Sequence, residues 1–172
     1  SRSISSSTLS YTWNTSGFSQ TLNNMSFKPD GTRVIIVDTG LNNIVSYNLS
    51  TPWDLSTATA HYTKTGIQTN NRGIYFKSDG ISVWINNASE ILSYTLSTAW
   101  DISSTWTNTF QTMNSTTLQN HTGHLKDIHF SSDGTKFYLC DFVNRRVTEW
   151  DCSTAFRADT ATYNNVSLDV YY

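Results

Sequence analysis

Residues 25–31 read Met-Ser-Phe-Lys-Pro-Asp-Gly, and this phrase returns at 74–80 as Ile-Tyr-Phe-Lys-Ser-Asp-Gly and at 128–134 as Ile-His-Phe-Ser-Ser-Asp-Gly. A second phrase follows each copy: Tyr-Asn-Leu-Ser-Thr-Pro-Trp-Asp at 47–54, Tyr-Thr-Leu-Ser-Thr-Ala-Trp-Asp at 94–101, and a more divergent Trp-Asp-Cys-Ser-Thr-Ala-Phe at 150–156. A period of roughly fifty residues is typical of repeat architectures, in which one unit cannot bury its apolar face alone.

Each first phrase begins as a strand with one apolar side. Its apolar residues alternate with polar ones, as in the pairs Met25/Phe27, Ile74/Phe76 and Ile128/Phe130. Such alternation indicates a strand with one face on a core, and the Asp-Gly pair that follows favours a tight hairpin turn. We therefore expect Phe27, Phe76 and Phe130 in equivalent buried positions.

Three further strands complete each repeat. The segments after the turn, 34–37, 83–85 and 137–140, are almost wholly apolar, which predicts a strand covered on both sides. The next strand alternates again and ends in the second phrase. A more polar outer strand is expected around 58–64, 105–112 and 160–170. The sequence thus predicts an all-β protein of three four-stranded antiparallel blades.

The Phe-x-x-Asp-Gly turn, followed by Tyr-x-Leu-Ser-Thr, resembles the repeats of YVTN and lactonase-like β-propellers. The match is closest to divergent extracellular and phage-structural repeats that carry a Leu-Ser-Thr-Ala-Trp-Asp phrase. The resemblance covers roughly residues 25–160 and implies a propeller fold. It implies little about function, because propellers serve as enzymes, lectins and scaffolds.

We expect a single domain over 1–172, made of an N-terminal segment at 1–24 and repeats at 25–64, 74–112 and 128–172. Closed propellers have about four to eight blades, so three repeats do not make a ring alone. Residues 8–13 resemble a fourth strand, yet the third repeat already has one. This surplus N-terminal strand predicts self-association by strand addition, into a ring or a filament; the alternative is an excerpt of a longer propeller.

Composition narrows the class of partner. Charged residues make up 14% of the 172, and the formal net charge is −2, so we expect no binding of nucleic acid. No apolar run reaches the roughly 20 residues of a membrane span, which predicts no membrane insertion. The chain begins at Ser1 without an apolar signal segment, which indicates either a processed protein or an excerpt. Its hydroxyl-rich, aromatic composition favours an extracellular location or one on a cell or virion surface.

Seven Asn-x-Ser/Thr sequons occur, and possible glycans are the modification they predict: Asn14, Asn24, Asn48, Asn87, Asn114, Asn120 and Asn165. Asn87 and Asn120 fall in expected loops and are the sites we expect to be occupied first. Asn48 lies in a strand and is the doubtful member. The alternative is a merely polar, Asn-rich surface.

The histidines of 121–129 are a candidate metal cluster. His121, His124 and His129, with Asp127, lie within nine residues. A solvated loop is the favoured interpretation, because His129 alternates with apolar residues and the corresponding loop at 70–73 reads Asn-Asn-Arg-Gly.

Another candidate set follows from the propeller resemblance, since lactonase-like hydrolases hold metal ligands around the central channel. Asp38, Asn87 and Asp141 end equivalent strands and could hold Ca²⁺, but side-chain bonds to their own turns explain them better. We therefore predict no metal and no cofactor.

The remaining residues suggest structural roles. Cys140 and Cys152 replace aliphatic residues of the other repeats, which predicts two buried, unpaired thiols. Trp53, Trp100 and Phe156 recur in phase, and packing between blades explains them better than sugar stacking does.

No catalytic motif is present, so the protein is not expected to be an enzyme. The leading hypothesis is a non-enzymatic extracellular structural or adhesive protein, assembled as a filament or virion fibre. A carbohydrate- or ligand-binding propeller module comes second, and a lactonase-like hydrolase third.

Overall fold

The computed structural model describes residues 12, 21–67, 69–113, 118 and 124–170, and these form three antiparallel sheets of four strands each. Sheet order follows chain order in every case, so each sheet is a blade. Blade 1 holds β1 (Leu22–Phe27), β2 (Arg33–Asp38), β3 (Asn43–Leu49) and β4 (Ala58–Lys64). Blade 2 holds β5 (Gly73–Phe76), β6 (Ser82–Asn86), β7 (Ile91–Leu96) and β8 (Trp106–Met113). Blade 3 holds β9 (Leu125–Phe130), β10 (Lys136–Asp141), β11 (Arg146–Cys152) and β12 (Ala161–Asp169). The predicted all-β fold is confirmed.

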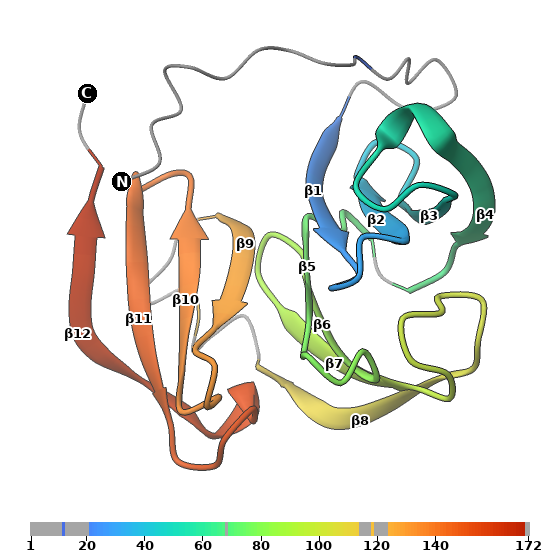
Figure 1. Cartoon of the computed structure of the whole chain (residues 1–172). Helices are drawn as coiled ribbons and strands as arrows, with labels where there is room; N and C mark the ends of the chain where they lie inside the picture. The colour runs from blue at the N-terminus through green and yellow to red at the C-terminus, as the bar shows by residue number, and fades with distance from the viewer. Residues whose placement is uncertain (1–11, 13–20, 68, 114–117, 119–123, 171–172) are drawn as a thin grey trace, which may run out of the picture.

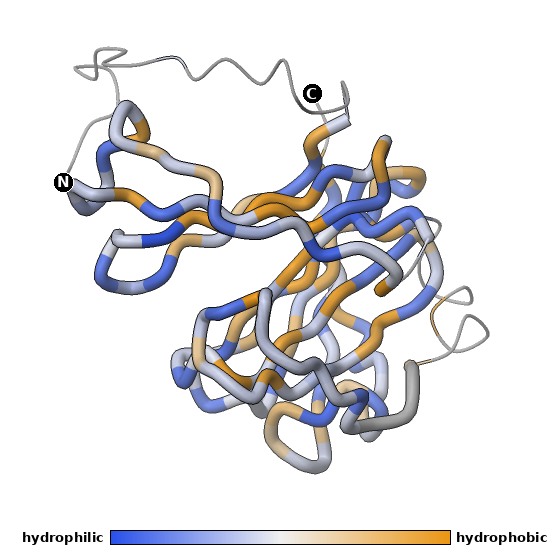
Figure 2. Tube along the Cα trace, turned by 90° about the vertical axis from the view of Figure 1, so that its right-hand side faces the viewer, coloured by the Kyte–Doolittle hydropathy of each residue, from blue (hydrophilic) through white to orange (hydrophobic). Residues whose placement is uncertain are grey.

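The first strands of the three blades lie side by side. β5 contacts β1 on one side and β9 on the other, and the later strands extend outward from this line (Figure 1). Short 3₁₀ turns precede the outer strands of blades 1 and 3, at Leu55–Thr57 and Ala158–Thr160. Apolar residues concentrate along the strands, while the hairpin turns are largely hydrophilic (Figure 2).

Each blade has two unlike faces. The Phe face carries Phe27, Phe76 or Phe130 together with the aromatic residue of the second phrase. The reverse face carries the intervening residues, with Ile35, Trp84 or Tyr138 at the middle of the second strand. Because side chains alternate along a strand, the two faces never share a residue.

The Phe face of one blade packs on the reverse face of the blade before it. In the core between blades 1 and 2, Ile35 and Val37 meet Phe76 and Trp100. In the core between blades 2 and 3, Trp84 meets Phe130, with ring centroids 4.7 Å apart. The same packing therefore occurs twice within one chain.

The two repeated phrases of each unit lock together through a glycine. Gly80, at φ +71°, lies against the indole of Trp100, where an added Cβ would come within 2.0 Å of the ring. The backbone N–H of Trp100 also donates to the Gly80 carbonyl over 2.8 Å. Gly31 with Trp53, and Gly134 with Phe156, repeat the arrangement. The turn glycine is thus required both for its positive φ and for the aromatic ring above it.

Two expectations about burial are wrong on blade 1. Phe76 and Phe130 are buried, but Phe27 is only half-buried, and Met25 is 63% exposed where its counterparts Ile74 and Ile128 are almost fully buried. Blade 1 follows no other described blade, so no sheet of the described chain packs on its Phe face. Phe27 and Tyr47 there pack only within the blade's own small cluster.

On blade 3 the reverse face is the open one. Tyr138 is half-buried and Cys140 is exposed, so the expectations of a doubly covered strand and of a buried Cys140 are wrong. Cys152 is half-buried rather than buried, and both cysteines are free, as expected from their different registers. Within the described residues, the three-blade stack therefore has one open Phe face, on blade 1, and one open reverse face, on blade 3.

The predicted surplus strand at 8–13 lies outside the described residues apart from Thr12, which is exposed and in no strand. None of the helices among the described residues is long and apolar enough to cross a membrane.

Candidate functional site

A polar cluster lies where the three inner strands begin. Asn24 on β1 donates from Nδ2 to Oδ1 of Asp127 on β9 over 2.9 Å, although the residues are 103 positions apart. Between them passes Gly73 of β5, where an added Cβ would lie 2.2 Å from Asn86 Oδ1 and 2.8 Å from Asp127 Oδ1. The glycine thus allows side chains of all three blades to approach one point.

This channel cluster, defined as Asn24, Gly73, Asn86 and Asp127, is rich in acceptors. Asn24 Oδ1 and Asn86 Oδ1 are buried and have no hydrogen-bond partner among the described residues. Burial raises the pKa of Asp127 above its ordinary value, against the backbone hydrogen bond from Ile128 and the charge of His129. Buried acceptors cost free energy when unpaired, so the cluster suits a donor or a cation.

A second pair adjoins this region. Arg72 Nη1 donates to His124 Nδ1 over 2.9 Å, so the proton of the neutral imidazole is on Nε2. Burial and the neighbouring Arg72 lower the pKa of His124, which keeps the ring neutral at pH 7. The His124 backbone N–H donates to Asp141 Oδ1 over 3.2 Å. The sequence analysis mentioned the loop at 70–73, which contains Arg72, but assigned Arg72 no role.

The predicted histidine cluster does not converge in the structure. His124 pairs with Arg72, Asp127 pairs with Asn24, and His129 is exposed, with its ring edge-to-face with the Tyr75 ring at 5.1 Å between ring centroids. His121 lies outside the described residues. No group of three or more His, Cys, Asp or Glu that could hold a metal occurs among the residues the structure describes.

The ring of Asp38, Asn87 and Asp141 has the structural role that its position suggested. Each side chain accepts from backbone N–H groups of its own hairpin: Asp38 from Leu41, Asn87 from Ser89 and Glu90, and Asp141 from Val143 and Asn144. Asp54 and Asp101 likewise accept from Ser56 and Ser103 in the bends after Trp53 and Trp100. These carboxylate and carboxamide side chains stabilise their own turns and do not converge on one centre.

An open trough of about 460 Å³ runs along the inner strands from the channel cluster. Asn24 and Asp127 line one part of it, and the aromatic side chains of Phe27, Phe76 and Trp100 line another. Met25 and Phe27, on the open Phe face of blade 1, form one side of this trough.

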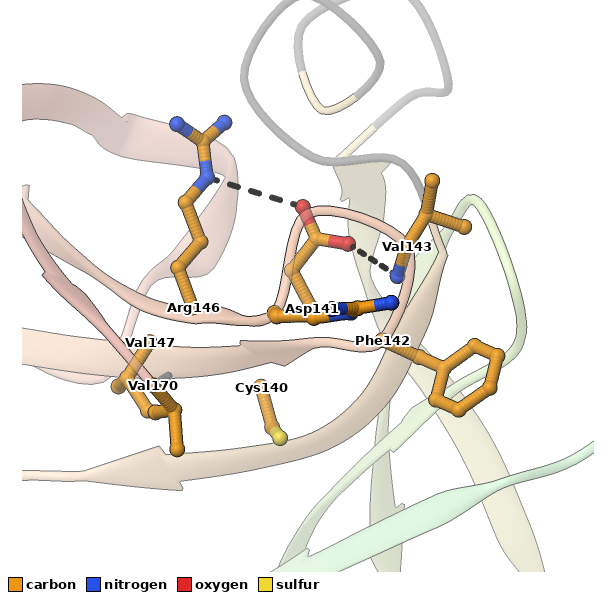
Figure 3. A pocket seen from close by; sticks show the side chains of 8 residues that line it. Cys140, Asp141, Phe142, Val143, Arg146, Val147 and Val170 are labelled. Carbon is orange, nitrogen blue, oxygen red and sulfur yellow. Dashed lines mark hydrogen bonds and ion pairs between the residues drawn. The ribbon is translucent and has the colours of Figure 1, made fainter. Parts of the chain in front are cut away.

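A larger hollow of about 740 Å³ lies at the β10–β11 hairpin on the open reverse face of blade 3 (Figure 3). Its lining is mostly apolar, with Cys140, Phe142, Val143, Val147 and Val170, and it also includes the charged residues Arg145, Arg146 and the buried Asp141. Although Cys140 is exposed as a residue, partial desolvation of its thiol and the nearby carboxylates Asp127 and Asp141 raise its pKa, so it is not an activated nucleophile. The hollow is therefore suited to packing rather than to chemistry.

The predicted glycosylation sites have different surroundings. Asn165 is exposed, whereas Asn87 is half-buried and its Oδ1 accepts from the backbone N–H groups of Ser89 and Glu90. Asn24 is bonded to Asp127, and Asn48 accepts from Arg33 Nε. The other three, Asn14, Asn114 and Asn120, lie outside the described residues.

Comparison with known proteins supports the fold. No family model and no curated protein sequence matches the chain. Among solved structures, a protein named as a candidate 6-phosphogluconolactonase from Bacteroides fragilis has 11% identity and a TM-score of 0.57 over 87% of this chain and 39% of its own. The corresponding candidate from Bacteroides uniformis has 16% identity and a TM-score of 0.57 over 83% and 39%.

A protein from Lactobacillus plantarum, 13% identical, has a TM-score of 0.56 over 86% of this chain and 42% of its own. The fold is that of three lactonase-like propeller blades. The chain spans about two-fifths of the length of these propellers, and at such identities the likeness concerns the fold alone.

Proposed function

We propose that this protein is a non-enzymatic structural module that works as part of a larger propeller assembly, with its open blade faces as the contact surfaces. The observation that carries the proposal is the contrast between Trp100, 8% exposed under a neighbouring blade, and Trp53, 59% exposed at the same position of blade 1. Exposed apolar patches of this kind mark interaction surfaces.

This proposal replaces strand addition with face packing as the mode of assembly. The open faces carry large apolar residues in the described structure, whereas the strand at 8–13 lies outside it. An extracellular or virion-surface location, and glycans on Asn165, stay part of the proposal. Intact mass before and after enzymatic deglycosylation of material from the natural source tests the glycans.

Oxidative footprinting tests the assembly itself. Met25 and Trp53 should react readily in the diluted 172-residue chain and be protected in the assembly isolated from its natural source. Tyr62 of β4, 42% exposed and away from the Phe face, provides the reference reactivity. Equal oxidation of Met25 in both samples contradicts the proposal.

A second candidate is hydrolysis of a lactone, which the structural likeness to candidate 6-phosphogluconolactonases favours. The channel cluster and the Arg72–His124 pair are where such chemistry would occur, because they combine unpaired acceptors with a neutral imidazole. Hydrolysis of 6-phosphogluconolactone that Asp127→Asn or His124→Gln abolishes would establish this candidate. Hydrolysis at the buffer rate supports the structural proposal.

A further inference from the structure

The channel cluster contains a carboxylate that no cation compensates. Asp127 Oδ1 accepts from Asn24 Nδ2 and from the backbone N–H of Ile128, each over 2.9 Å. None of the ion pairs among the described residues includes Asp127. Desolvation raises the pKa of this carboxyl, the direction expected of a partly buried charge without a counter-ion. A cation that also donates hydrogen bonds would stabilise such a charge most.

Two carboxamides add further acceptors. Asn24 Nδ2 donates to Asp127, and Asn86 Nδ2 donates to the backbone carbonyl of the next residue over 3.3 Å. The nitrogen of each carboxamide is therefore used, while its buried oxygen has no partner. Turning the Asn24 carboxamide over would place its oxygen against the Asp127 carboxylate, so the hydrogen bonds fix this orientation.

These acceptors meet beside Gly73. Asn86 is 0% exposed, and its Oδ1 lies 2.2 Å from the point where a Cβ added to Gly73 would lie. Asp127 Oδ1 lies 2.8 Å from the same point. Acceptors from the first strands of blades 1 and 3 and from the second strand of blade 2 thus gather where β5 has no side chain.

We propose that the channel cluster binds the ammonium group of a small primary amine. A primary ammonium has three N–H donors, no acceptor and one positive charge, which matches two carboxamide oxygens and one carboxylate. A calcium ion takes about six to eight oxygen ligands, more than the described side chains of the cluster supply. The site requires only three consecutive blades of this chain and not what lies beyond them, and it goes beyond the proposed structural role.

The trough of about 460 Å³ provides access to the cluster and room for the rest of the amine. Its lining includes Asn24 and Asp127 at the cluster, and Ile74, Phe76 and Trp100 of blade 2. The rings of Phe76 and Trp100 are stacked, with centroids 4.8 Å apart. Sites for small molecules are typically apolar clefts of about 300–1,000 Å³ with a few polar groups. The expected ligand is therefore an amine with a short apolar or aromatic body.

Isothermal titration calorimetry of the 172-residue chain with phenethylamine tests the inference. Saturable one-to-one binding is expected at neutral pH, where this amine is protonated. Two analogues separate the features of the ligand. Phenethyltrimethylammonium has the charge without N–H donors, and phenethyl alcohol has the ring without the charge. Each should bind at least about tenfold more weakly, because neither forms the full set of charge-assisted hydrogen bonds.

A pair of variants tests the protein side. Asp127→Asn removes the charge but keeps the shape of the side chain, and should weaken binding of phenethylamine by at least about tenfold. Asp169→Asn makes the same change in charge at an exposed position of β12 and is the matched control, which should bind like the wild type. Backbone amide resonances of Gly73 and Asp127 should shift on titration, and that of Gly66 should not. Urea unfolding shows that both variants are folded.

A chain without saturable amine binding at millimolar concentration overturns the inference, as does an affinity that Asp127→Asn leaves unchanged. Equal binding of phenethyl alcohol would mean that the trough alone recognises the ring. Equal binding of the trimethylammonium compound would mean that charge alone is recognised, and both results overturn the inference. Binding of Ca²⁺ but not of the amine, abolished by Asp127→Asn, would assign the cluster to a metal ion and also overturns it. None of these results changes the protection of Trp53 expected in the natural assembly, so the proposed function is tested separately.

Discussion

Blades 1 and 2 carry the same two phrases in the same strands, yet one Phe face is buried and the other is open. Ile74, Phe76 and Trp100 are 3%, 6% and 8% exposed, whereas Met25 and Trp53 at matching positions are 63% and 59% exposed. The strands themselves do not cause this difference, because their register and turns agree. In a stacked repeat, the neighbouring blade decides whether an apolar residue contributes to the core or to a contact surface.

The largest expected effect of this difference is on core stability. Phe76→Ala should lower the free energy of unfolding by about 3–5 kcal/mol, because the ring fills the core between two blades. Phe27→Ala should cost about half as much or less, since Phe27 is half-buried and packs only within blade 1. Urea unfolding of both variants below the association concentration measures the difference. Equal losses would contradict the assigned burial.

The turn glycines sharpen the comparison. Gly31 and Gly80 have nearly the same positive φ, and in both an added methyl group would meet an indole ring. Alanine at a positive φ costs about 1–2 kcal/mol by itself. Gly80→Ala must also displace the buried Trp100, while Gly31→Ala displaces the exposed Trp53 and should cost less.

Gly66→Ala is the matched control, because it measures the backbone cost of a positive φ without any contact with a ring. Gly66 has φ +72° and no atom within 4 Å of an added Cβ, so its loss should be only the backbone cost of about 1–2 kcal/mol. Thermal or urea unfolding of the three variants should rank them Gly80, Gly31, Gly66 from the largest loss to the smallest. A Gly66 variant as damaged as Gly80 would mean that the ring contact contributes nothing.

The smallest effect concerns the channel cluster. The folded pKa of Asp127 lies above its ordinary value of 3.8 because the carboxyl is partly desolvated among the inner strands. A raised folded pKa favours the folded state below pH 3.8 and loses that contribution as the pH rises through the folded pKa. Asp127→Asn should therefore be slightly more stable than the wild type at neutral pH and lose this advantage in acid. A variant with the same pH dependence as the wild type would contradict the burial of this carboxyl.

The repeats made the fold predictable. Alternating residues marked the strands, the Asp-Gly pairs marked the turns, and residues such as Phe76 and Phe130 lie where periodicity placed them. The turn roles of Asp38, Asn87 and Asp141 were also foreseen correctly, because short-range side-chain bonds depend only on local sequence.

What depends on neighbouring blades was not predictable in the same way. Exposure of Met25 and Cys140 follows from which face lacks a partner, and periodicity within a strand carries no information about that. The Asn24–Asp127 bond joins the first blade to the third, and no local pattern marks such a pair. The packing of Trp100 on Gly80 had a sequence signal, because an aromatic residue follows the turn glycine after 22, 20 and 22 residues in the three repeats, but its cause becomes clear only in the structure.

Oxidative footprinting tests the central claim most directly, that the open Phe face of blade 1 is a contact surface of a larger propeller assembly. Trp53, 59% exposed in this chain, should be protected from oxidation in the assembly isolated from the natural source, while Tyr62, 42% exposed and on the other face of blade 1, should react equally in both samples. Equal oxidation of Trp53 in the isolated chain and in the natural assembly would contradict the claim.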